Sequence, residues 1–203
     1  MTTFIAGIDF SAPSHEVAPQ LIGVTVLVNG VGGRIVETEA YDMTEPAAHT
    51  FGGPSARNAA MFGPPGHAYV YLSHGIHWCL NFVCREPGHG AGVLIRAIEP
   101  LAGLDAMRVR RGGEDVRMLC SGPGKLCQAM GVTRTEHNGK ALTAPPFELL
   151  ARGAWEARTG HGAAAAAAAL VVAVGPRIGI SKAVELPWRF GEAGSRFLSR
   201  PFR

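Results

Sequence analysis

The sequence predicts an α+β fold, a single domain in which a mixed, largely antiparallel curved sheet is flanked by helices and long loops. Segments rich in β-branched residues alternate with short stretches of helical spacing. The 27 glycines and 14 prolines among 203 residues predict many turns. Hydrophobic residues make up 47% of the chain and charged residues 17%, which favours a packed core over disorder. No abrupt change of composition marks a boundary, so we expect one domain over residues 1–203.

The first elements are a helix and a hairpin. Residues 1–13 mix apolar and turn-forming types without a period, and we expect a loose lead-in before a helix that begins near Ser14. Residues 21–27 are rich in β-branched types and residues 34–41 alternate, which predicts two paired strands. The residues expected to form the turn between these strands are Asn29-Gly30 and Gly32-Gly33.

A long polar segment and three further strands follow. Residues 42–65 are interrupted by several prolines and glycines, and long loops inside compact domains are often functional. Residues 68–72, 77–83 and 91–98 are predicted strands, and the last is apolar enough to be central in the sheet.

The second half of the chain predicts flanking helices. Leu101 to Arg111 has helical spacing, and residues 123–130 form a short predicted helix that Gly131 ends. We interpret the alanine run Ala163 to Ala169 as a variable loop that leads into a strand over residues 170–174.

Charge and cysteine content narrow the class of protein. The formal net charge of +3 suits a polyanionic partner without identifying it. No apolar run approaches the roughly 20 residues that cross a bilayer, so we expect a soluble intracellular protein with no membrane partner. The four cysteines lack CxxC spacing and are expected to be reduced and mostly buried: Cys79, Cys84, Cys120 and Cys127.

Two carboxylates stand out in the predicted strand over residues 34–41. Side chains alternate across a strand, so Ile35, Glu37, Glu39 and Tyr41 are expected on one side of it. Taken alone, a Glu-x-Glu pair in a hairpin is more often a solvated face than a catalytic site. The motifs elsewhere in the chain change that interpretation.

From about Leu21 onward the chain carries a series of motifs in one order. They are Glu37-Thr38-Glu39-Ala40-Tyr41, Ala47-Ala48-His49, Arg57-Asn58, Met61-Phe62-Gly63-Pro64-Pro65-Gly66, Tyr69 to His77, Cys79-Leu80-Asn81, Val93 to Pro100, Ser121 to Ala129, Pro176 to Ile180 and Pro187-Trp188-Arg189-Phe190. With these blocks the sequence resembles the alkyladenine (3-methyladenine) DNA glycosylase family. The resemblance implies a DNA-repair enzyme that flips alkylated or deaminated purines out of double-stranded DNA and hydrolyses the N-glycosidic bond.

The resemblance also implies which residues carry the chemistry. Glu39 matches the family's general base, which activates a water, and Arg96 matches the arginine that orients this carboxylate. Glu37 is the rival base because it shares the predicted face. The resemblance implies a monofunctional glycosylase, in which water and not a lysine is the nucleophile, and it implies no cofactor. His74 and His77 lack further ligands, so no catalytic metal is expected.

Pocket and DNA contacts follow from the same matches. Tyr41, His49 and Tyr71 match aromatic walls that stack on a flipped base, and Asn81 matches the residue that disfavours guanine's exocyclic amino group. His74 stands where animal members carry a tyrosine that wedges into the duplex. Two basic residues are further expected to contact DNA: Arg57, and Lys125 beside a helix start. The expected protein is a monomer in the cytoplasm, associated with the nucleoid if the source is a bacterium.

Two other functions remain open at this point. One is a non-catalytic damaged-DNA-binding module that keeps the pocket, against which the presence of both Glu39 and Arg96 argues. The other is a nucleoside hydrolase acting on free nucleosides, against which the lack of an aspartate-rich metal site argues.

Overall fold

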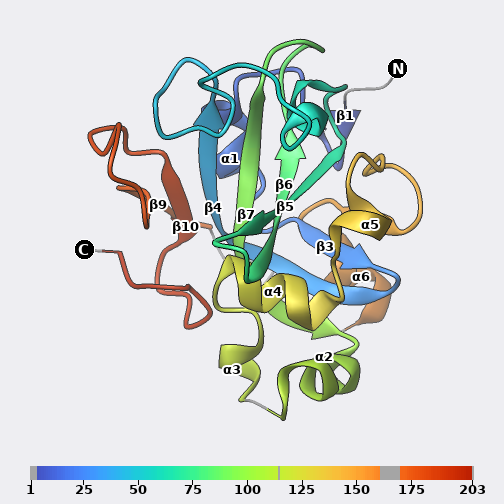
Figure 1. Cartoon of the computed structure of the whole chain (residues 1–203). Helices are drawn as coiled ribbons and strands as arrows, with labels where there is room; N and C mark the ends of the chain where they lie inside the picture. Colours follow the sequence, from blue (N-terminus) through green and yellow to red (C-terminus); the bar gives the residue numbers. More distant parts are fainter. Residues whose placement is uncertain (1–3, 114, 161–169, 203) are drawn as a thin grey trace.

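The computed structural model describes residues 4–113, 115–160 and 170–202, and the alanine run predicted as a loop lies outside them. Its core is an eight-stranded sheet with the order β5-β6-β7-β4-β10-β9, to which β3 and β8 add beside β4 (Figure 1). The pairings within this sheet are antiparallel, so the predicted α+β class and the largely antiparallel sheet are confirmed, without parallel strands among the described residues.

The strands are β1 (Phe4–Ile5), β2 (Ile8–Asp9), β3 (Thr25–Val28), β4 (Val31–Asp42), β5 (Ala68–Ser73), β6 (His77–Val83), β7 (Ala91–Ala102), β8 (Phe147–Leu150), β9 (Val172–Gly175) and β10 (Arg189–Glu192). The helices are α1 (Ser14–Gln20), α2 (Leu104–Arg111), α3 (Val116–Leu119), α4 (Pro123–Met130), α5 (Arg134–His137) and α6 (Ala154–Thr159), with a 3-10 turn η1 (Ala59–Phe62).

The predicted first hairpin is present, with one correction to its turn. Asn29 and Gly30 both have positive φ and connect β3 to β4. Gly32 and Gly33 lie inside β4 instead of in the turn. A Cβ on Gly33 would stand 1.9 Å from the carbonyl oxygen of Glu99 on β7, so glycine is needed there for close strand approach and not for a turn.

The three central strand predictions are confirmed, and one boundary is wrong. β6 has the predicted bounds, and β7 lies between β6 and β4 as expected of the most apolar strand. β7 continues to Ala102, however, so the predicted helix from Leu101 begins only at Leu104, after Gly103 in the left-handed region. α4 and its terminal Gly131 are as predicted.

The N-terminal segment is not the loose lead-in that the sequence predicted. β1 and β2 form a small antiparallel pair before α1. Ile5, Ile8 and Phe10 are buried within the main hydrophobic core, because the apolar residues that showed no period pack directly onto it. α1 begins at Ser14 as predicted.

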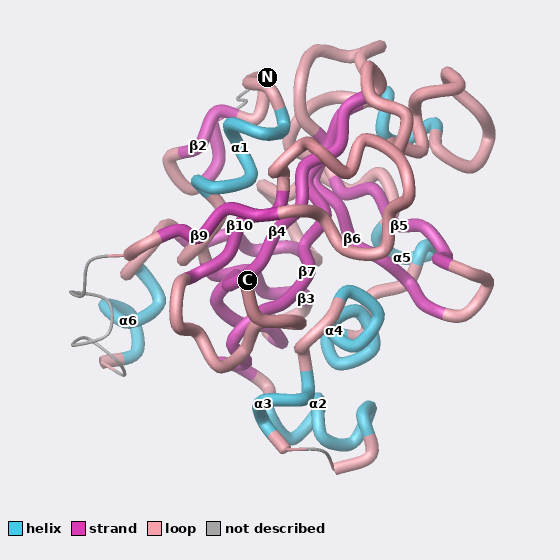
Figure 2. Tube along the Cα trace, turned by 90° about the vertical axis from the view of Figure 1, so that its left-hand side faces the viewer, coloured by secondary structure: helices cyan, strands magenta, loops and turns pink. Residues whose placement is uncertain are grey.

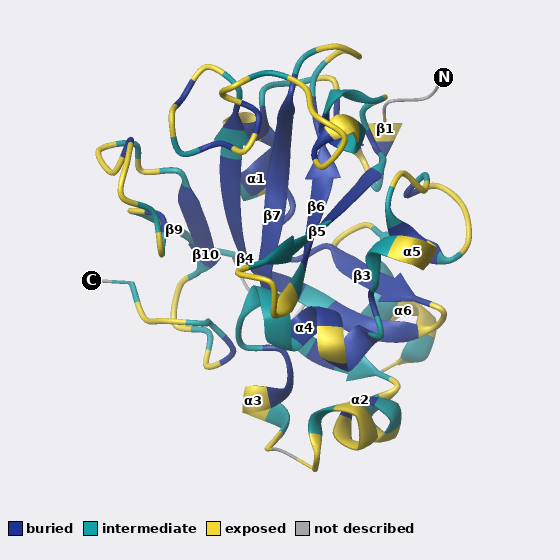
Figure 3. Ribbon diagram, viewed as in Figure 1, coloured by how far each residue is buried: buried dark blue, intermediate teal, exposed yellow. Residues whose placement is uncertain are grey.

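The core lies between the sheet and the helices that cover it (Figure 3). α1 packs on β4 and β7, while α4 packs on β6 and β7. The helices α2, α3 and α4 gather at one end of the sheet in both Figure 1 and the perpendicular view of Figure 2. At the opposite end of the sheet, β4 and β7 are flanked by loops (Figure 1).

β4 presents two different sides to the protein. Thr38 donates a hydrogen bond to the carbonyl of Ala18 in α1, so this side of the strand faces the helix. Glu37 and Glu39 instead both accept hydrogen bonds from Arg96 of β7. Ile35 does not accompany them as predicted but lies in the main core, because the register against β7 shifts between Ile35 and Glu37.

Two expectations about the whole chain can be compared with the structure. All four cysteines are buried and free, as predicted. No helix within the described residues combines the length and the apolar character needed to cross a membrane.

Candidate active site

A cavity of about 480 Å³ opens where β4, β5, β6 and β7 approach the loop segments at one end of the sheet. Its walls combine aromatic, polar and small side chains. They are Tyr41, Pro46, Ala47, His49, Met61, Tyr69, Tyr71, Ser73, His74, Cys79, Asn81, Leu94, Arg96, Pro123, Ile178, Gly179, Ile180, Ser181 and Lys182. Six of the nine site residues that the sequence predicted therefore line one cavity.

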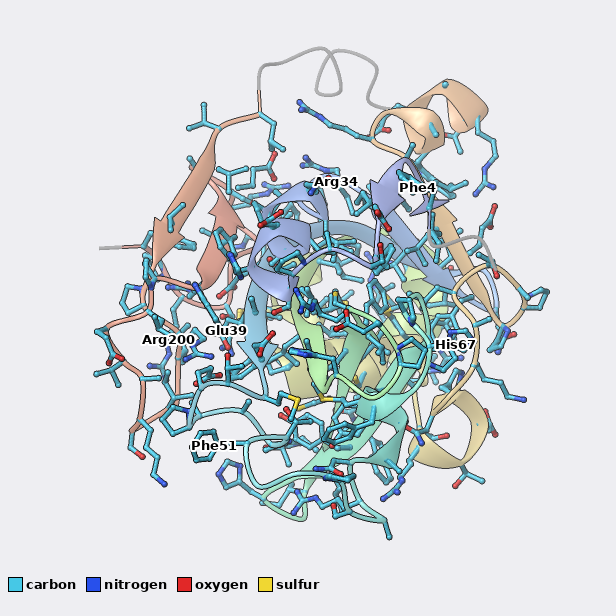
Figure 4. All side chains as sticks on the ribbon, turned by 90° about the horizontal axis from the view of Figure 1, so that it is seen from above. Phe4, Arg34, Glu39, Phe51, His67 and Arg200 are labelled. Carbon is cyan, nitrogen blue, oxygen red and sulfur yellow. The ribbon has the colours of Figure 1, made fainter. Side chains whose placement is uncertain are left out.

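Glu39 lies directly behind this wall and has no exposed surface. Its Oε1 accepts a hydrogen bond of 2.7 Å from the backbone N–H of Ile178. Its Oε2 accepts hydrogen bonds from the Tyr41 hydroxyl at 2.9 Å and from Arg96 Nη1 at 3.2 Å. All three donors belong to residues that line the cavity. Figure 4 labels Glu39 on β4, on the side of the sheet that faces the C-terminal strands.

These contacts act on the charge of the carboxylate. Burial raises the pKa of Glu39 above its ordinary value, while Arg96, the Ile178 N–H and the Tyr41 hydroxyl each oppose that rise. Burial and the neighbouring Glu39 carboxylate raise the pKa of Tyr41, so its hydroxyl remains a donor. Glu39 is thus a buried carboxylate that accepts hydrogen bonds from three donors, each of which favours its ionised form.

Glu37, the rival carboxylate, has a different environment. It accepts hydrogen bonds from Arg96 Nε at 3.1 Å, from Arg189 Nε at 2.7 Å and from the backbone N–H of Ser199 at 2.6 Å. It does not line the cavity. Glu37 therefore ties the C-terminal segment to β4, and Arg96 bridges it to Glu39. Burial alone would lower the pKa of Arg96, but the two carboxylates raise it above its ordinary value.

Two of the three predicted aromatic walls, His49 and Tyr71, contact each other at the cavity. The rings of His49 and Tyr71 lie edge to face with their centroids 4.4 Å apart. Tyr69, which was not predicted, stacks on Tyr71 at 5.5 Å. Loss of surrounding water lowers the pKa of His49, with a smaller contribution from Arg57, so this ring favours its neutral form.

Asn81 lies buried on β6 with its side chain turned to the neighbouring strand. Its Nδ2 donates a hydrogen bond of 3.3 Å to the carbonyl of Tyr69. That contact fixes the amide at the cavity wall, where its oxygen is the remaining polar atom. The role predicted for Asn81 beside a base stays a prediction.

His74 lies at the exposed tip of the β5–β6 hairpin and also lines the cavity. Its φ is 51°, in the left-handed region, and Gly75 follows with a φ of 71°. The Ser73 hydroxyl lies 3.0 Å from His74 Nδ1. Ile76 follows on the same tip with 71% of its surface exposed.

The two other predicted DNA contacts lie outside the cavity wall. Arg57 is exposed and donates a hydrogen bond to the carbonyl of Leu72 near the hairpin tip. Lys125 lies half-buried on α4, two residues beyond Pro123 of the cavity wall. Neither residue contacts the Glu39 cluster in the described hydrogen bonds.

The sequence interpretation missed the segment from Arg177 to Lys182. Ile178 supplies the N–H to Glu39, and exposed Lys182 adds a positive charge at the cavity. Arg177 lies with its guanidinium carbon 4.7 Å from the centroid of the Tyr41 ring. The motif block Pro176 to Ile180 overlaps this segment and could have drawn attention to it. No pattern within the block, however, assigned a role to any single residue.

The chain is similar over nearly its whole length to known proteins. The model of the methylpurine-DNA glycosylase family matches residues 8–196. A protein of Nitrosospira multiformis provisionally named 3-methyladenine DNA glycosylase is 62% identical over 196 residues, which cover 97% of this chain and 94% of the relative. Proteins with the same provisional name from Rhodopseudomonas palustris strain BisB18 and Granulibacter bethesdensis are 61% and 52% identical, over 95% and 94% of this chain and 89% and 84% of their own lengths.

Proposed function

Because the chain belongs to the methylpurine-DNA glycosylase family, we propose that it excises alkylated or deaminated purines from duplex DNA, using a water that Glu39 activates. The observation that carries the proposal is the set of three donors on the Glu39 carboxylate, Arg96, Tyr41 and Ile178, at the wall of an aromatic cavity. A flipped nucleotide would place its base in the cavity and its anomeric carbon near Glu39.

The chemistry needs a base more than an acid. A purine alkylated on a ring nitrogen carries a positive charge and is already a good leaving group. Water attacks the anomeric carbon and passes a proton to the Glu39 carboxylate, while the electron pair of the glycosidic bond moves to the ring nitrogen of the leaving base. Oε1 of Glu39 accepts one described hydrogen bond, which leaves it a lone pair for that water.

Binding of the base would rest on the aromatic walls. Tyr41, His49 and Tyr71 offer ring faces and edges that favour electron-poor, alkylated purines. Asn81 is buried in the cavity wall with its amide held by the Tyr69 carbonyl, so it would leave little room for the exocyclic amino group of a normal guanine.

Holding the duplex would fall to residues around the cavity mouth. His74 on the hairpin tip would fill the space that the flipped nucleotide leaves, and Arg57 and Lys125 would contact phosphates. One copy of the chain suffices for this task, so we propose a monomer that works in the cytoplasm at the nucleoid.

A base-release assay tests the proposal. Purified protein is incubated with a methylated duplex, a hypoxanthine-containing duplex and free inosine, and the released bases are quantified. We expect release from the duplexes and none from inosine. Binding without release would indicate a damaged-DNA-binding module, and release from inosine would indicate a nucleoside hydrolase.

A second measurement tests the nucleophile. If water attacks, borohydride added during turnover traps no covalent protein–DNA adduct. A trapped adduct would show that a side-chain amine is the nucleophile and would contradict the proposed mechanism.

A further inference from the structure

Arg177 and Glu45 form a buried ion pair immediately behind the cavity wall. Arg177 Nη1 lies 2.6 Å from Glu45 Oε1, and Nη2 lies 3.0 Å from Oε2, so the pair is bidentate. The two side chains are 0% and 5% exposed. The guanidinium also donates to the carbonyls of Ala40 and Ala183. The pair is therefore fixed in place, with its charges held at one position.

This pair connects two loop segments that both contribute to the cavity wall. Glu45 precedes Pro46 and Ala47, and its Oε2 also accepts a hydrogen bond from the Ala47 N–H. Arg177 directly precedes Ile178, the donor to Glu39. Both neighbouring segments line the cavity.

The guanidinium of the pair also covers one face of a wall residue. The Arg177 Cζ atom lies 4.7 Å from the centroid of the Tyr41 ring, and Arg177 is absent from the cavity wall. A base that stacks on Tyr41 from the cavity therefore uses the other face. One aromatic ring then separates the Arg177 charge from the base.

We propose that Glu45 neutralises Arg177 behind Tyr41 and thereby sets how strongly the cavity prefers a cationic base over a neutral one. The inference rests on the proposed function, because it concerns the base that the cavity would hold. An unpaired arginine behind Tyr41 repels a cationic purine across the ring and also draws on the electron density that the purine would use. With Glu45 ionised beside it, that repulsion is offset.

The other charged groups near the cavity are already balanced or lie toward solvent. Arg96 is paired with both Glu37 and Glu39. Lys182 and Arg57 are exposed, so water screens their charges. The Glu45–Arg177 pair is thus a buried ion pair whose guanidinium lies over the ring of Tyr41, a proposed stacking residue.

The test compares binding of two lesions that differ in charge. In the Glu39→Gln background, which prevents base release, dissociation constants are measured by fluorescence anisotropy for duplexes containing 7-methylguanine, a cation, or hypoxanthine, which is neutral. We expect Glu45→Gln to weaken binding of the 7-methylguanine duplex relative to the hypoxanthine duplex by about tenfold.

Two further variants separate charge from damage to the fold. Glu45→Gln combined with Arg177→Gln removes both charges, and we expect the ratio of the two dissociation constants to return to within about twofold of the parent. Glu99→Gln, which breaks the half-buried pair with Arg34 away from the cavity, lowers stability but leaves the ratio unchanged.

The outcomes are distinct. A ratio that Glu45→Gln shifts and the double variant restores supports the inference. A loss of affinity that is equal for both lesions, or a shifted ratio that the double variant retains, overturns it, because the pair then only holds the walls in place. Failure of the unsubstituted enzyme to release any base contradicts the proposed function instead, in a separate assay.

Discussion

The backbone N–H of Ile178 donates a hydrogen bond of 2.7 Å to Oε1 of Glu39 across 139 residues of sequence. The same carboxylate is bound by Arg96 and Tyr41, so its position and charge are set by three separate segments of the chain. The Tyr41 contact comes from a side-chain hydroxyl, so it can be removed while the Arg96 and Ile178 donors remain.

Glu39→Gln is expected to reduce base release by at least about 10²-fold, because an amide cannot accept the proton of the attacking water. Binding of lesion-containing duplex should be preserved. Single-turnover kinetics measure the release rate, and fluorescence anisotropy measures the binding of the lesion-containing duplex. The matched variant Glu37→Gln should leave much of the activity. Two donors to Glu37, Arg189 and Ser199, lie outside the cavity wall, whereas all three donors to Glu39 line it. The reverse result would assign the base to Glu37.

Tyr41→Phe is expected to lower the release rate about tenfold while retaining the stacking ring, because a hydrogen bond to a charged group is lost. The Tyr41 hydroxyl lowers the pKa of Glu39, so its removal raises that pKa further. The base works in its ionised form and activity is lost as pH falls through the pKa. The acid limb of the pH–rate profile should therefore move to higher pH. An unmoved limb would show that this hydrogen bond does not act on the catalytic group.

His74→Tyr is expected to tighten binding of lesion duplex by roughly fivefold, because a larger ring stacks better in the gap that a flipped base leaves. The φ of 51° at this position is poorly suited to a bulky residue, so stability should fall by about 1 kcal/mol. Anisotropy with lesion duplex, together with urea unfolding, measures both effects. An equal gain with undamaged duplex would indicate a general DNA contact instead of a wedge.

Gly33→Ala is expected to destabilise the protein by about 3 kcal/mol or more, because the new Cβ would overlap the carbonyl oxygen of Glu99. Gly52→Ala is the matched control, since a Cβ there meets nothing within 4 Å. Urea unfolding curves of the two variants test this difference. Equal stability of the two would mean that β4 and β7 can separate at Gly33 without cost.

Much of this architecture follows from local patterns. The strands β5 and β6, the end of α4 at Gly131 and the Asn29-Gly30 turn were predicted because each depends on residues near one another in the chain. Gly32 and Gly33 were placed in a turn because their role depends on strands β3 and β7, which no local pattern reveals. The buried core contacts of Ile5 and Phe10 were missed for the same reason.

In the candidate site too, some features could be predicted from local motifs and others depend on residues far apart in the sequence. The residue types at Glu39, Arg96 and the aromatic walls were identified from motifs, and the structure brings them together. The partners that distinguish Glu37 from Glu39 were not predictable, because Arg189 and Ser199 lie more than 150 residues farther along the chain. Two carboxylates spaced by one residue look equivalent until these distant donors are known.

The dependence of β4 on the last part of the chain has a consequence for biosynthesis. Strand β4 leaves the ribosome well before Ile178 and Ser199, which donate to Glu39 and Glu37 and lie 139 and 162 residues farther along the chain. A nascent chain can assemble β3 to β7 while both carboxylates still lack these donors. If Glu39 acts as proposed, its donors are complete only after Ile178 has emerged. A shorter translation product would keep the aromatic residues Tyr41, His49 and Tyr71 but would lack this donor and the part of the cavity wall that residues 178–182 form.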